Sequence, residues 1–591
     1  MVSTLTLVLA GVLLYTVVAM ALRQRGVLPD FVHVSGPLTT LHTQRGKKVL
    51  DRLAQRKRFW RAWGNLGLGI ALVFLVGLFA IVLLSAYQNV LEPTANPIQE
   101  PKNALVIPGL NDFLPLSAAP DIIFGLLVGL VVHEGGHGLL CRVEDIDIDS
   151  MGVALFTIVP IGAFVEPDEE DRKASGRGAQ ARMFAAGVTN NFAVTVIAFA
   201  LLFGPVTGSI AVASGVPIGG TLPNSPAREA GLANGDVITA VEGTTVDDAD
   251  ELDALLANTS EETVSVTTKD GETRQVDRAV LVTQALEDGP IDIEAGDTIL
   301  AVNGTAVGTE DAFANALESR SIATLELQGD ATRTGPVGAY ASAITDGGPL
   351  DDAGAPAGES VVVTQIDGER IVDAETMQDV LADIDPGTTV SVEVFVDGER
   401  DSLDVELDEN PRTDGALLGV SRVQPGYSGI VVDDFGNRVY PAETYLSILS
   451  GDGLIGGLSD GSLAFVMFTI LVLPFAAVAD PTLGFNFAGF IGPVTEFYTI
   501  QGPLEPLGGG GVFLAANLLF WTGWVNFNLG LFNCIPAFPL DGGHLLRAST
   551  EAILSRTPLN RREHVQTVTI SIGLIMLVSL ILMLFGPQLL S

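Results

Sequence analysis

The stretch Asp121-Ile-Ile-Phe-Gly-Leu-Leu-Val-Gly-Leu-Val-Val-His133-Glu134-Gly-Gly-His137-Gly-Leu-Leu-Cys141 combines a long apolar run with three ionisable side chains. The run is long enough to cross a hydrocarbon core, which takes about 20 residues of helix. An ionisable side chain costs at least about 2.5 kcal/mol at the centre of a bilayer. Three of them within five positions need a compensating partner such as a metal ion. A chance polar cluster inside a helix bundle is the alternative.

The two histidines of this stretch have the spacing of metal ligands on a helix. His133 and His137 are four residues apart, so a helix places both imidazoles on one face. Such a pair can bind one metal ion, and Glu134 between them is then placed to take a proton from bound water. A catalytic zinc site of this type needs a third protein ligand from elsewhere. We therefore predict one zinc ion (Zn²⁺) per chain.

The third ligand is predicted to be Asp541, in Asn533-Cys-Ile-Pro-Ala-Phe-Pro-Leu-Asp541-Gly-Gly-His544. The two prolines are expected to end the helix that starts near Gly511. The two glycines are expected to permit unusual backbone angles. A carboxylate on an unwound stretch at membrane depth indicates a nearby cation, and a helix-capping or snorkelling aspartate is the alternative. His544 is a weaker ligand candidate.

The composition separates an apolar part of the chain from an acidic one. Apolar residues make up 48% of the 591 residues, yet 70 acidic and 31 basic residues give a formal net charge of −39. We expect the apolar residues in membrane spans and the acidic ones on a water-exposed middle region. The acidic surface indicates either a soluble domain kept apart by self-repulsion or, as we favour, a halophilic, haloarchaeal protein in concentrated salt. Nucleic acid is not expected as a partner, since the acidic region has no basic stripe.

Seven apolar runs have the length of helical spans. They are residues 4–22, 63–86, 121–141, 182–204, 461–479, 511–535 and 565–586. The basic stretch 23–61 is expected on the cytoplasmic side, as are the Arg-containing loops before the fourth and the last span. The acidic middle region is then outside. The almost uncharged segment 481–510 is expected to be re-entrant, since the spans on either side of it otherwise need the same direction.

Residues 151–165 form an apolar run that is too short and too β-branched for a helical span. Non-helical backbone at membrane depth is tolerated only where protein or a watery cavity satisfies its polar groups. We therefore predict a re-entrant β-hairpin beside the metal site.

The acidic middle region, roughly 205–420, contains internal repeats. Residues 221–243 are echoed at 294–304 and, more weakly, at 361–368. Each copy is typical of a strand that ends in a turn. The pattern Ser-Pro-Ala…Ala-Gly-Leu…Gly-Asp-Val-Ile at 225–238 resembles PDZ domains. That resemblance implies small α+β domains whose sheet edge accepts an extended peptide or a chain end.

The two motifs together resemble the site-2 protease family of intramembrane zinc metalloproteases. The first motif is His-Glu-Gly-Gly-His at 133–137, and the second is Asn-x-x-Pro-x-x-Pro-Leu-Asp-Gly-Gly at 533–543. Gly-Ala-Phe-Val at 162–165 is similar to part of the family's re-entrant hairpin, and a PDZ-like region lies before the second motif. The resemblance covers about 121–550 in order.

The resemblance implies the roles of the principal site residues. His133, His137 and Asp541 bind zinc. Glu134 is the general acid/base, and Asn533 helps to polarise the substrate carbonyl.

The resemblance also implies three substrate-binding residues. Gly162 and Phe164 belong to the hairpin. The stretch Ala-Gly-Val-Thr-Asn at 186–190 is similar to the family's Gly-Pro-x-x-Asn stretch, although Val188 replaces the proline. Asn190 is therefore either a substrate-binding residue or a residue that hydrogen-bonds between helices.

The fold class predicted from these features is a polytopic α-helical membrane protein with a re-entrant β-hairpin and extracytoplasmic α+β PDZ-like domains. We divide the chain into a two-span N-terminal region, the first half of the membrane core, a PDZ-like domain, a degraded PDZ-like repeat, a further PDZ-like repeat, and the second half of the core. The ranges are 1–120, 121–204, 205–283, 284–340, 341–420 and 421–591.

The predicted function is hydrolysis of peptide bonds in membrane-anchored proteins by an intramembrane zinc metalloprotease. The expected partners are membrane-protein substrates, the lipid bilayer, and a peptide or chain end at the PDZ-like region. The expected location is the cell membrane, with the active site nearer the cytoplasmic side. The alternative is a non-catalytic PDZ-containing receptor or scaffold, in which His544 or Cys534 closes a structural metal site as a fourth protein ligand.

Overall fold

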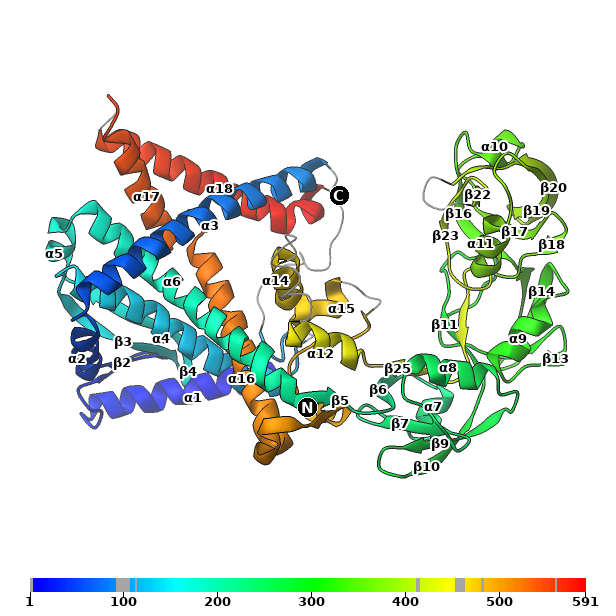
Figure 1. The fold of residues 1–591 in the computed structure, drawn as a ribbon, viewed down its shortest axis with the longest axis horizontal. Helices are drawn as coiled ribbons and strands as arrows, with labels where there is room; N and C mark the ends of the chain where they lie inside the picture. The colour runs from blue at the N-terminus through cyan, green and yellow to red at the C-terminus, as the bar shows by residue number, and fades with distance from the viewer. Residues whose placement is uncertain are drawn as a thin grey trace. The chain divides into compact units, whose positions relative to one another are not determined.

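The computed structural model describes residues 4–91, 107–111, 114–410, 415–451, 463–479, 483–558 and 561–590. The chain forms two compact units, whose elements are labelled in Figure 1. The helical unit comprises Met1–Ala211, Glu443–Thr495 and Thr499–Ser591. The sheet unit comprises Val212–Ala442 and Glu496–Tyr498.

Five helices in the described part of the chain are long and apolar enough to cross a membrane. They are α3 (Lys57–Leu91), α4 (Ala119–Val143), α6 (Arg177–Leu201), α16 (Gly508–Asn533) and α18 (Arg562–Leu590). They coincide with the predicted spans 63–86, 121–141, 182–204, 511–535 and 565–586. The prediction of a polytopic helical membrane protein is therefore confirmed.

The other two predicted spans form shorter apolar helices. Residues 4–22 lie in α1 (Thr4–Gln24), in which the apolar segment counted is Leu9–Gln24. Within 461–479, α14 (Leu463–Val472) gives way to a 3-10 turn that contains Pro474, because proline has no backbone N–H to continue the helix. Residues 461–462 and 480–482 lie outside the described residues, so the predicted re-entrant course of 481–510 stays a prediction.

Helices α4, α6 and α16 pack against one another at glycines. A Cβ atom at Gly125 of α4 would lie 2.7 Å from the carbonyl oxygen of Trp521 in α16, and one at Gly129 would lie 3.5 Å from the Asn526 amide. The two helices therefore run in the same direction. A Cβ at Gly136 would lie 2.7 Å from the Ala186 carbonyl of α6. Only glycine permits backbones to approach this closely.

Three of these helices are joined by one carboxylate where α4 ends. The Glu144 side chain is only 6% exposed and accepts from Arg61 Nε of α3 at 3.2 Å. It also lies 2.9 Å from Arg182 Nη2 of α6. Because a carboxylate with two guanidinium partners is well satisfied, this cluster holds the ends of α3, α4 and α6 together.

The predicted hairpin at 151–165 is present as a hairpin, and it belongs to a larger sheet. Strands β3 (Ile148–Phe156) and β4 (Val159–Pro167) pair antiparallel. They extend a sheet of order β1-β2-β3-β4, in which β1 (Val32–Ser35) and β2 (Leu38–His42) come from the basic N-terminal stretch. Side chains at the hairpin tip are apolar and exposed, with Ile158 at 78%. The re-entrant position of the hairpin in a bilayer stays a prediction.

The sheet unit contains three six-stranded sheets of the same topology. Module 1 has the order β10-β9-β7-β6-β25, module 2 the order β15-β14-β12-β11-β24, and module 3 the order β20-β19-β17-β16-β23, each with one further short strand. The strands of module 1 are β6 (Val216–Thr221), β7 (Val237–Val241), β8 (Thr244–Thr245), β9 (Thr263–Thr268), β10 (Thr273–Asp277) and β25 (Asn437–Val439). Those of module 2 are β11 (Val280–Gln284), β12 (Thr298–Val302), β13 (Thr305–Ala306), β14 (Ile322–Leu327), β15 (Thr332–Pro336) and β24 (Val431–Asp433). Those of module 3 are β16 (Ala339–Ile344), β17 (Val361–Ile366), β18 (Glu369–Arg370), β19 (Thr389–Val396), β20 (Glu399–Glu406) and β23 (Val420–Val423).

The sequence repeats mark the same hairpin in each module. Strands β7, β12 and β17 each end in a two-residue turn with positive φ at both residues. These turns are Glu242-Gly243, Asn303-Gly304 and Asp367-Gly368. Positive φ at two successive residues is the signature of a type I′ hairpin turn, for which glycine is preferred. The prediction of three strands that end in turns is therefore confirmed.

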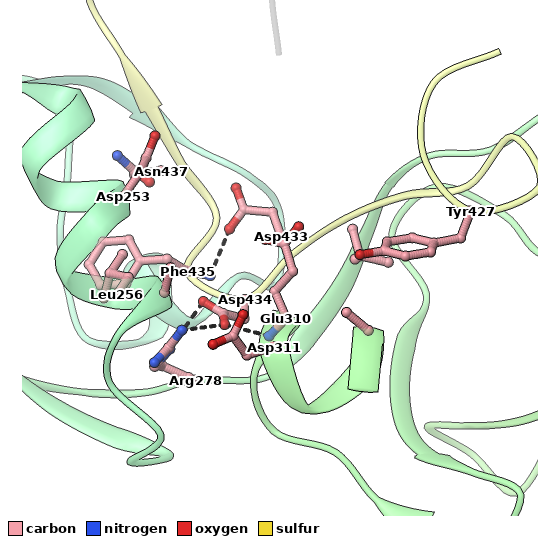
Figure 2. A pocket seen from close by; sticks show the side chains of 13 residues that line it. Asp253, Leu256, Arg278, Glu310, Asp311, Tyr427, Asp433, Asp434, Phe435 and Asn437 are labelled. Atoms are coloured by element: carbon pink, nitrogen blue, oxygen red, sulfur yellow. Dashed lines mark hydrogen bonds and ion pairs between the residues drawn. The ribbon is translucent and has the colours of Figure 1, made fainter. Parts of the chain in front are cut away.

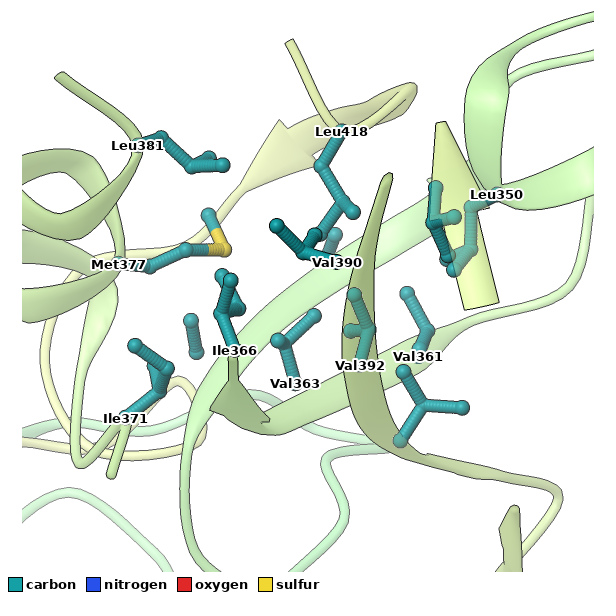
Figure 3. Close-up of a cluster of buried hydrophobic side chains, with 14 of the residues drawn as sticks. Leu350, Val361, Val363, Ile366, Ile371, Met377, Leu381, Val390, Val392 and Leu418 are labelled. Carbon is teal, nitrogen blue, oxygen red and sulfur yellow. The ribbon is translucent and has the colours of Figure 1, made fainter. Parts of the chain in front are cut away.

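Each module buries one face of its sheet against a helix. The helices are α8 (Ala249–Ala257), α9 (Glu310–Leu317) and α11 (Ala374–Ala382). In module 3, alternate residues such as Val361 and Val363 of β17 point into the same cluster as Met377 of α11 (Figure 3). The period of two matches a half-buried strand, so each module has its own core.

The last strand of each sheet comes from the returning segment 420–439. This segment supplies β23 to module 3, then β24 to module 2, and finally β25 to module 1. Module 3 is therefore inserted in module 2, and module 2 in module 1. Strands β24 and β25 lie in the range 421–591 that the sequence grouped with the membrane core, whereas the contacts assign residues up to Ala442 to the sheet unit.

Candidate metal centre

Helix α4 carries the first motif on its inner face. Pro120 and Asp121 in the first turn favour the start of a helix there. Near the other end, the side chains of His133 and His137 are 8% and 12% exposed. Both imidazoles are thus largely withdrawn from solvent, as the i, i+4 spacing predicts.

The second motif forms the tight connection between α16 and α17 (Asp541–Leu554). Helix α16 ends at Asn533 before Pro536, as predicted, and Asp541 is the first residue of α17. The expectation that Gly542 and Gly543 adopt unusual backbone angles is wrong, because both lie in the first turn of α17. Their role is steric: a Cβ at Gly542 would lie 2.3 Å from the Ile535 carbonyl. The missing side chains let the connection fold back onto α17.

The two motifs meet at three ligand-type atoms. Asp541 Oδ2 lies 3.1 Å from His133 Nε2 and 3.2 Å from His137 Nε2. The two Nε2 atoms are 3.2 Å apart. Residues more than 400 positions apart in the chain therefore present one oxygen and two nitrogens to a single point.

This triangle fits a divalent metal ion. Zinc with N and O ligands at about 2.0–2.2 Å in tetrahedral geometry sets neighbouring ligand atoms about 3.3 Å apart. Asp541 Oδ2 is buried and makes no regular hydrogen bond in the described structure, although both imidazole nitrogens are close to it. Glu134 has a ligand atom within 4.8 Å of those of the two histidines. Two imidazoles and a carboxylate are a donor set that catalytic zinc sites use.

The Nδ1 side of each imidazole faces helix α6. His137 Nδ1 lies 2.8 Å from the Met183 carbonyl oxygen, so it is the protonated nitrogen and leaves Nε2 free to bind a metal. His133 Nδ1 lies 3.2 Å from the Asn191 amide. Between these contacts, a Cβ at Gly187 would lie 2.7 Å from both His133 Cε1 and His137 Nε2. Metal-bound histidines generally have outer partners of this kind.

The sequence indicated Asn190, for substrate binding or for a hydrogen bond between helices, and did not indicate Asn191. The Asn190 amide accepts a hydrogen bond from Trp63 Nε1 of α3 at 3.0 Å, which is a contact between helices. Asn191 follows it by one residue and so points about 100° away around the helix. The signal that identifies Asn191 is its i, i+4 spacing from Gly187, which puts both on the face towards α4. A substrate-binding role for Asn190 stays a prediction.

The Glu134 side chain is hydrogen-bonded to strand β4 of the four-stranded sheet. Its Oε2 accepts a hydrogen bond from the backbone N–H of Val165 in β4 at 3.1 Å. Of the two predicted substrate-binding residues in β4, Gly162 pairs with Ala154 of β3, and Phe164 packs edge-on against His42 at a ring distance of 5.1 Å. The structure therefore brings the hairpin to the metal centre, and the roles of Gly162 and Phe164 stay predictions.

The remaining candidates near the second motif have other contacts. Asn533 donates from Nδ2 to the Leu529 carbonyl of its own helix at 2.9 Å. The His544 ring stacks on Phe184 at 4.2 Å. Cys534 is buried in an apolar cluster. The group of ligand-type side chains that the described residues bring together on α4 consists of His133, Glu134 and His137, and the closure of the site by His544 or Cys534 stays an alternative.

A second concave site, an acidic cleft, lies between modules 1 and 2 (Figure 2). Its volume is about 410 Å³, and Asp253 of α8, Glu310 of α9 and Asp433 of β24 line it. Beneath them, Asp434 forms a buried ion pair with Arg278, with 2.5 Å between Oδ2 and Nη2. Burial and the neighbouring aspartates raise the pKa of Glu310 to about 7.

The chain's similarity to known proteins agrees with this geometry. The model of Peptidase family M50 matches residues 121–580, which is most of the chain. The chain belongs to peptidase family M50. This family M50 chain is 24% identical over 470 residues to a protein of Vibrio cholerae named "Putative zinc metalloprotease", which covers 74% of the chain and 90% of that protein.

Two further relatives match shorter parts of this family M50 chain. An uncharacterized protein of Methanocaldococcus jannaschii is 29% identical over 164 residues, or 27% of the chain and 42% of that protein. A protein of Clostridium perfringens that also bears the name "Putative zinc metalloprotease" is 28% identical over 165 residues, or 23% and 47%. Family membership, the His-Glu-His group and the five long apolar helices together make the chain a membrane-embedded zinc metalloendopeptidase. The predicted family, reaction and metal are confirmed.

Proposed function

We propose that this M50 metalloprotease cleaves membrane-anchored proteins within or near the bilayer, with His133, His137 and Asp541 as the zinc ligands. The observation that carries the proposal is the convergence of the three ligand atoms at 3.1–3.2 Å on helices α4 and α17, beside the apolar helix α16. When bound, zinc supplies Lewis acidity that polarises a carbonyl and lowers the pKa of water towards about 7.

Glu134 is the proposed general acid/base. It lies beside the two histidines, so its carboxylate is within reach of a water that approaches the ligand atoms. It takes the proton from that water and passes it to the leaving amine. The hydrogen bond from Val165 fixes the direction of the carboxylate. A base held in this way needs little reorganisation before the proton moves.

Asn533 is the proposed group that polarises the substrate carbonyl. Helices α4 and α16 run in the same direction, with Gly129 level with Asn526 and Leu529. One turn further along, His133 is level with Asn533 at the end of α16. The bond from Asn533 to Leu529 uses one amide N–H, and an amide group has a second one for a substrate oxygen.

The outer edge of β4 is the proposed site that holds the unwound substrate. Because the Val165 N–H points to Glu134 and away from β3, the backbone of Ala163, two residues earlier, points to the same outer edge. β4 is the last strand on its side of the described sheet. An extended substrate segment that pairs with this edge lies directly in front of Glu134. The apolar, exposed hairpin tip supports a position of the hairpin within the bilayer.

The three modules are proposed to be PDZ-like domains on the extracytoplasmic side that select substrates by an exposed peptide or chain end. Each sheet ends in a short strand, β23, β24 or β25, and an edge of this kind accepts a further strand. The basic N-terminal stretch supports a cytoplasmic position for β1 and β2, and so an active site nearer the cytoplasm. The excess of acidic residues supports a halophilic origin.

The test of this proposal is a cleavage assay on single-span membrane substrates with the purified full-length protein. Glu134→Gln is expected to lower the cleavage rate by about 10²–10⁴-fold and to keep one zinc per chain. Asp541→Ala is expected to lose zinc as well as activity. Cleavage by Glu134→Gln at the wild-type rate would remove Glu134 from its role, and full zinc content in Asp541→Ala would remove Asp541 from the ligands. A non-catalytic scaffold predicts no cleavage by the wild type.

A further inference from the structure

Behind the metal centre, the contact between α4, α6 and α16 buries an unusual set of polar side chains. Asn191 of α6 and Asn526 of α16 are 0% exposed, and Thr522 of α16 is 8% exposed. These residues lie inside the helices that cross the membrane. Buried polar groups there are retained only when hydrogen bonds satisfy them.

One polar atom of each of these residues has no protein partner in the described part of the chain. The atoms are Asn191 Oδ1, Asn526 Oδ1 and Thr522 Oγ1. The other ends of the two amides are occupied, since Asn526 Nδ2 donates to the Thr522 carbonyl at 2.8 Å and Asn191 Nδ2 lies 3.2 Å from His133 Nδ1. Three unsatisfied polar atoms at one helix junction point to a common polar ligand.

The three residues approach α4 at successive turns, Thr522 through its backbone and the two asparagines through their side chains. A Cβ at Gly125 would lie 3.1 Å from the Thr522 backbone nitrogen, and one at Gly129 would lie 3.5 Å from the Asn526 amide. Asn191 meets α4 at His133, one turn beyond Gly129. Side chains one turn apart on one helix, such as Thr522 and Asn526 of α16, have Cβ atoms about 5–6 Å apart. Two hydrogen bonds of about 2.8 Å through one water molecule span that distance.

The direction of the Asn191 amide follows from the tautomer of His133. For Nε2 of His133 to bind a metal as a neutral imidazole, its Nδ1 must carry the proton, as in His137. The partner of an N–H must be an acceptor, so Asn191 presents its oxygen to His133, and its NH₂ group points into the junction. A water molecule there accepts from Asn191 and donates to Asn526 Oδ1, and it or a second water reaches Thr522 Oγ1. Buried waters typically make about three such bonds.

We propose that bound water between Asn191, Asn526 and Thr522 forms an outer hydrogen-bond shell of the metal centre, in which Asn191 is the positioning residue for His133. The metal part of this proposal rests on the proposed role of His133 as a zinc ligand. The water site at Asn526 Oδ1 and Thr522 Oγ1 rests on the unsatisfied atoms alone, whereas the side of the Asn191 amide that faces this water follows from the role of His133.

The first test is the thermal unfolding of full-length Thr522→Val in detergent, without metal. If water satisfies the hydroxyl, its replacement by a methyl group removes a hydrogen bond and lowers the unfolding midpoint. If the junction is dry, the same change removes an unsatisfied group and raises the midpoint or leaves it unchanged, which would overturn the water site. Thr195→Val calibrates the expected loss, because the Thr195 hydroxyl is buried and hydrogen-bonded, with the backbone carbonyls of Asn191 and Gly523 at 3.0 and 3.2 Å.

The second test is the rate of zinc release to a chelator. Asn191→Leu is expected to release zinc about 10–100-fold faster than the wild type, the usual cost of losing an outer partner of a metal ligand. Asn191→Asp keeps an oxygen acceptor for His133 and is expected to restore slow release, which a merely space-filling role does not predict. Equal release rates for wild type and Asn191→Leu would exclude the positioning role. If the wild-type protein binds no zinc, the proposed function is contradicted. The unfolding of metal-free Thr522→Val still shows in that case whether water is bound at the junction.

Discussion

The backbone N–H of Val165 in β4 donates a hydrogen bond of 3.1 Å to the carboxylate of Glu134 in α4. This bond joins the strand that we propose for substrate holding to the residue that we propose for proton transfer. It also fixes the side to which Ala163 directs its backbone, since Ala163 is two residues before Val165 and lies before the register shift between β3 and β4 is reached. A substrate strand that pairs with the outer edge of β4 would therefore lie at a fixed distance from Glu134.

Ala163→Pro is expected to slow the cleavage of a membrane-spanning substrate by at least about tenfold and to leave the zinc content unchanged. Proline removes the N–H on the outer edge of β4, where a substrate strand would pair, and it is tolerated on an edge strand when that N–H faces outward. The measurement is the cleavage rate together with metal analysis. Gly162→Pro is the matched control, because its N–H faces β3 and its loss is expected to disturb the hairpin itself. An Ala163→Pro enzyme with wild-type kinetics would exclude pairing at this edge.

Gly135→Ala and Gly136→Ala are expected to differ sharply although they are neighbours. A Cβ at Gly136 would lie 2.7 Å from the Ala186 carbonyl, whereas a Cβ at Gly135 meets nothing within 4 Å. Gly136→Ala therefore forces α4 and α6 apart and is expected to lower stability by about 1–3 kcal/mol. Gly135→Ala is expected to be neutral or slightly stabilising, because alanine is the better helix former. Thermal unfolding in detergent measures both, and equal effects would contradict this packing.

Gly187→Ala is expected to weaken zinc binding directly. The added methyl group would lie 2.7 Å from His133 Cε1 and from His137 Nε2, so both imidazoles must move. Zinc titration against a chelator measures the loss, which we expect to be at least about tenfold, as for other changes to the partners of metal ligands. Gly69→Ala in α3 is the control, since a Cβ there meets nothing within 4 Å. Wild-type affinity in Gly187→Ala would show that α6 does not press on the imidazoles.

The acidic cleft is expected to make the sheet unit less stable as the pH rises. The pKa of Glu310 is raised from 4.5 to about 7, mainly by burial and then by Asp434 and Asp433. The folded state therefore binds the proton more tightly than the unfolded state does. The stabilisation is complete below about pH 4.5 and is lost as the pH rises through about 7. Glu310→Gln is expected to flatten this dependence and to raise the unfolding midpoint at about pH 8, and an unchanged pH profile would contradict the assignment.

The features that sequence predicted well are those in which single residues have a strong physical effect. Long apolar runs identified the five long helices, because only a membrane or a deep core accommodates them. The meeting of His133, His137 and Asp541 was expected because ionisable groups in such runs need a reason, and their role as zinc ligands stays a prediction. The turns after β7, β12 and β17 were identified because two successive residues with positive φ favour glycine.

The features that sequence reasoning missed depend on tertiary pairing or on a rotation about a helix. Strands β1 and β2 are four and five residues long and lie in a basic stretch with no clear alternation, so only their pairing with β3 defines them. Strands β23, β24 and β25 have only four, three and three residues. The contact of Asn191 with His133 depends on the rotation of about 100° that separates it from Asn190 around α6, which motif similarity does not show. The space that Gly542 and Gly543 leave for the Ile535 and Ala537 backbone is likewise visible only in three dimensions.

The insertion of module 3 in module 2, and of module 2 in module 1, has a consequence for synthesis on the ribosome. The module whose first strand is synthesised first receives its last strand last. In module 1, β6 pairs with β25, which is synthesised more than 200 residues later. Until then, each unfinished sheet exposes the edge that its returning strand will cover, and unpaired edges invite wrong partners. A nascent chain that stops before residue 420 therefore carries three open edges at once, and complete translation of the segment 420–439 is the event that closes them in the order 3, 2, 1.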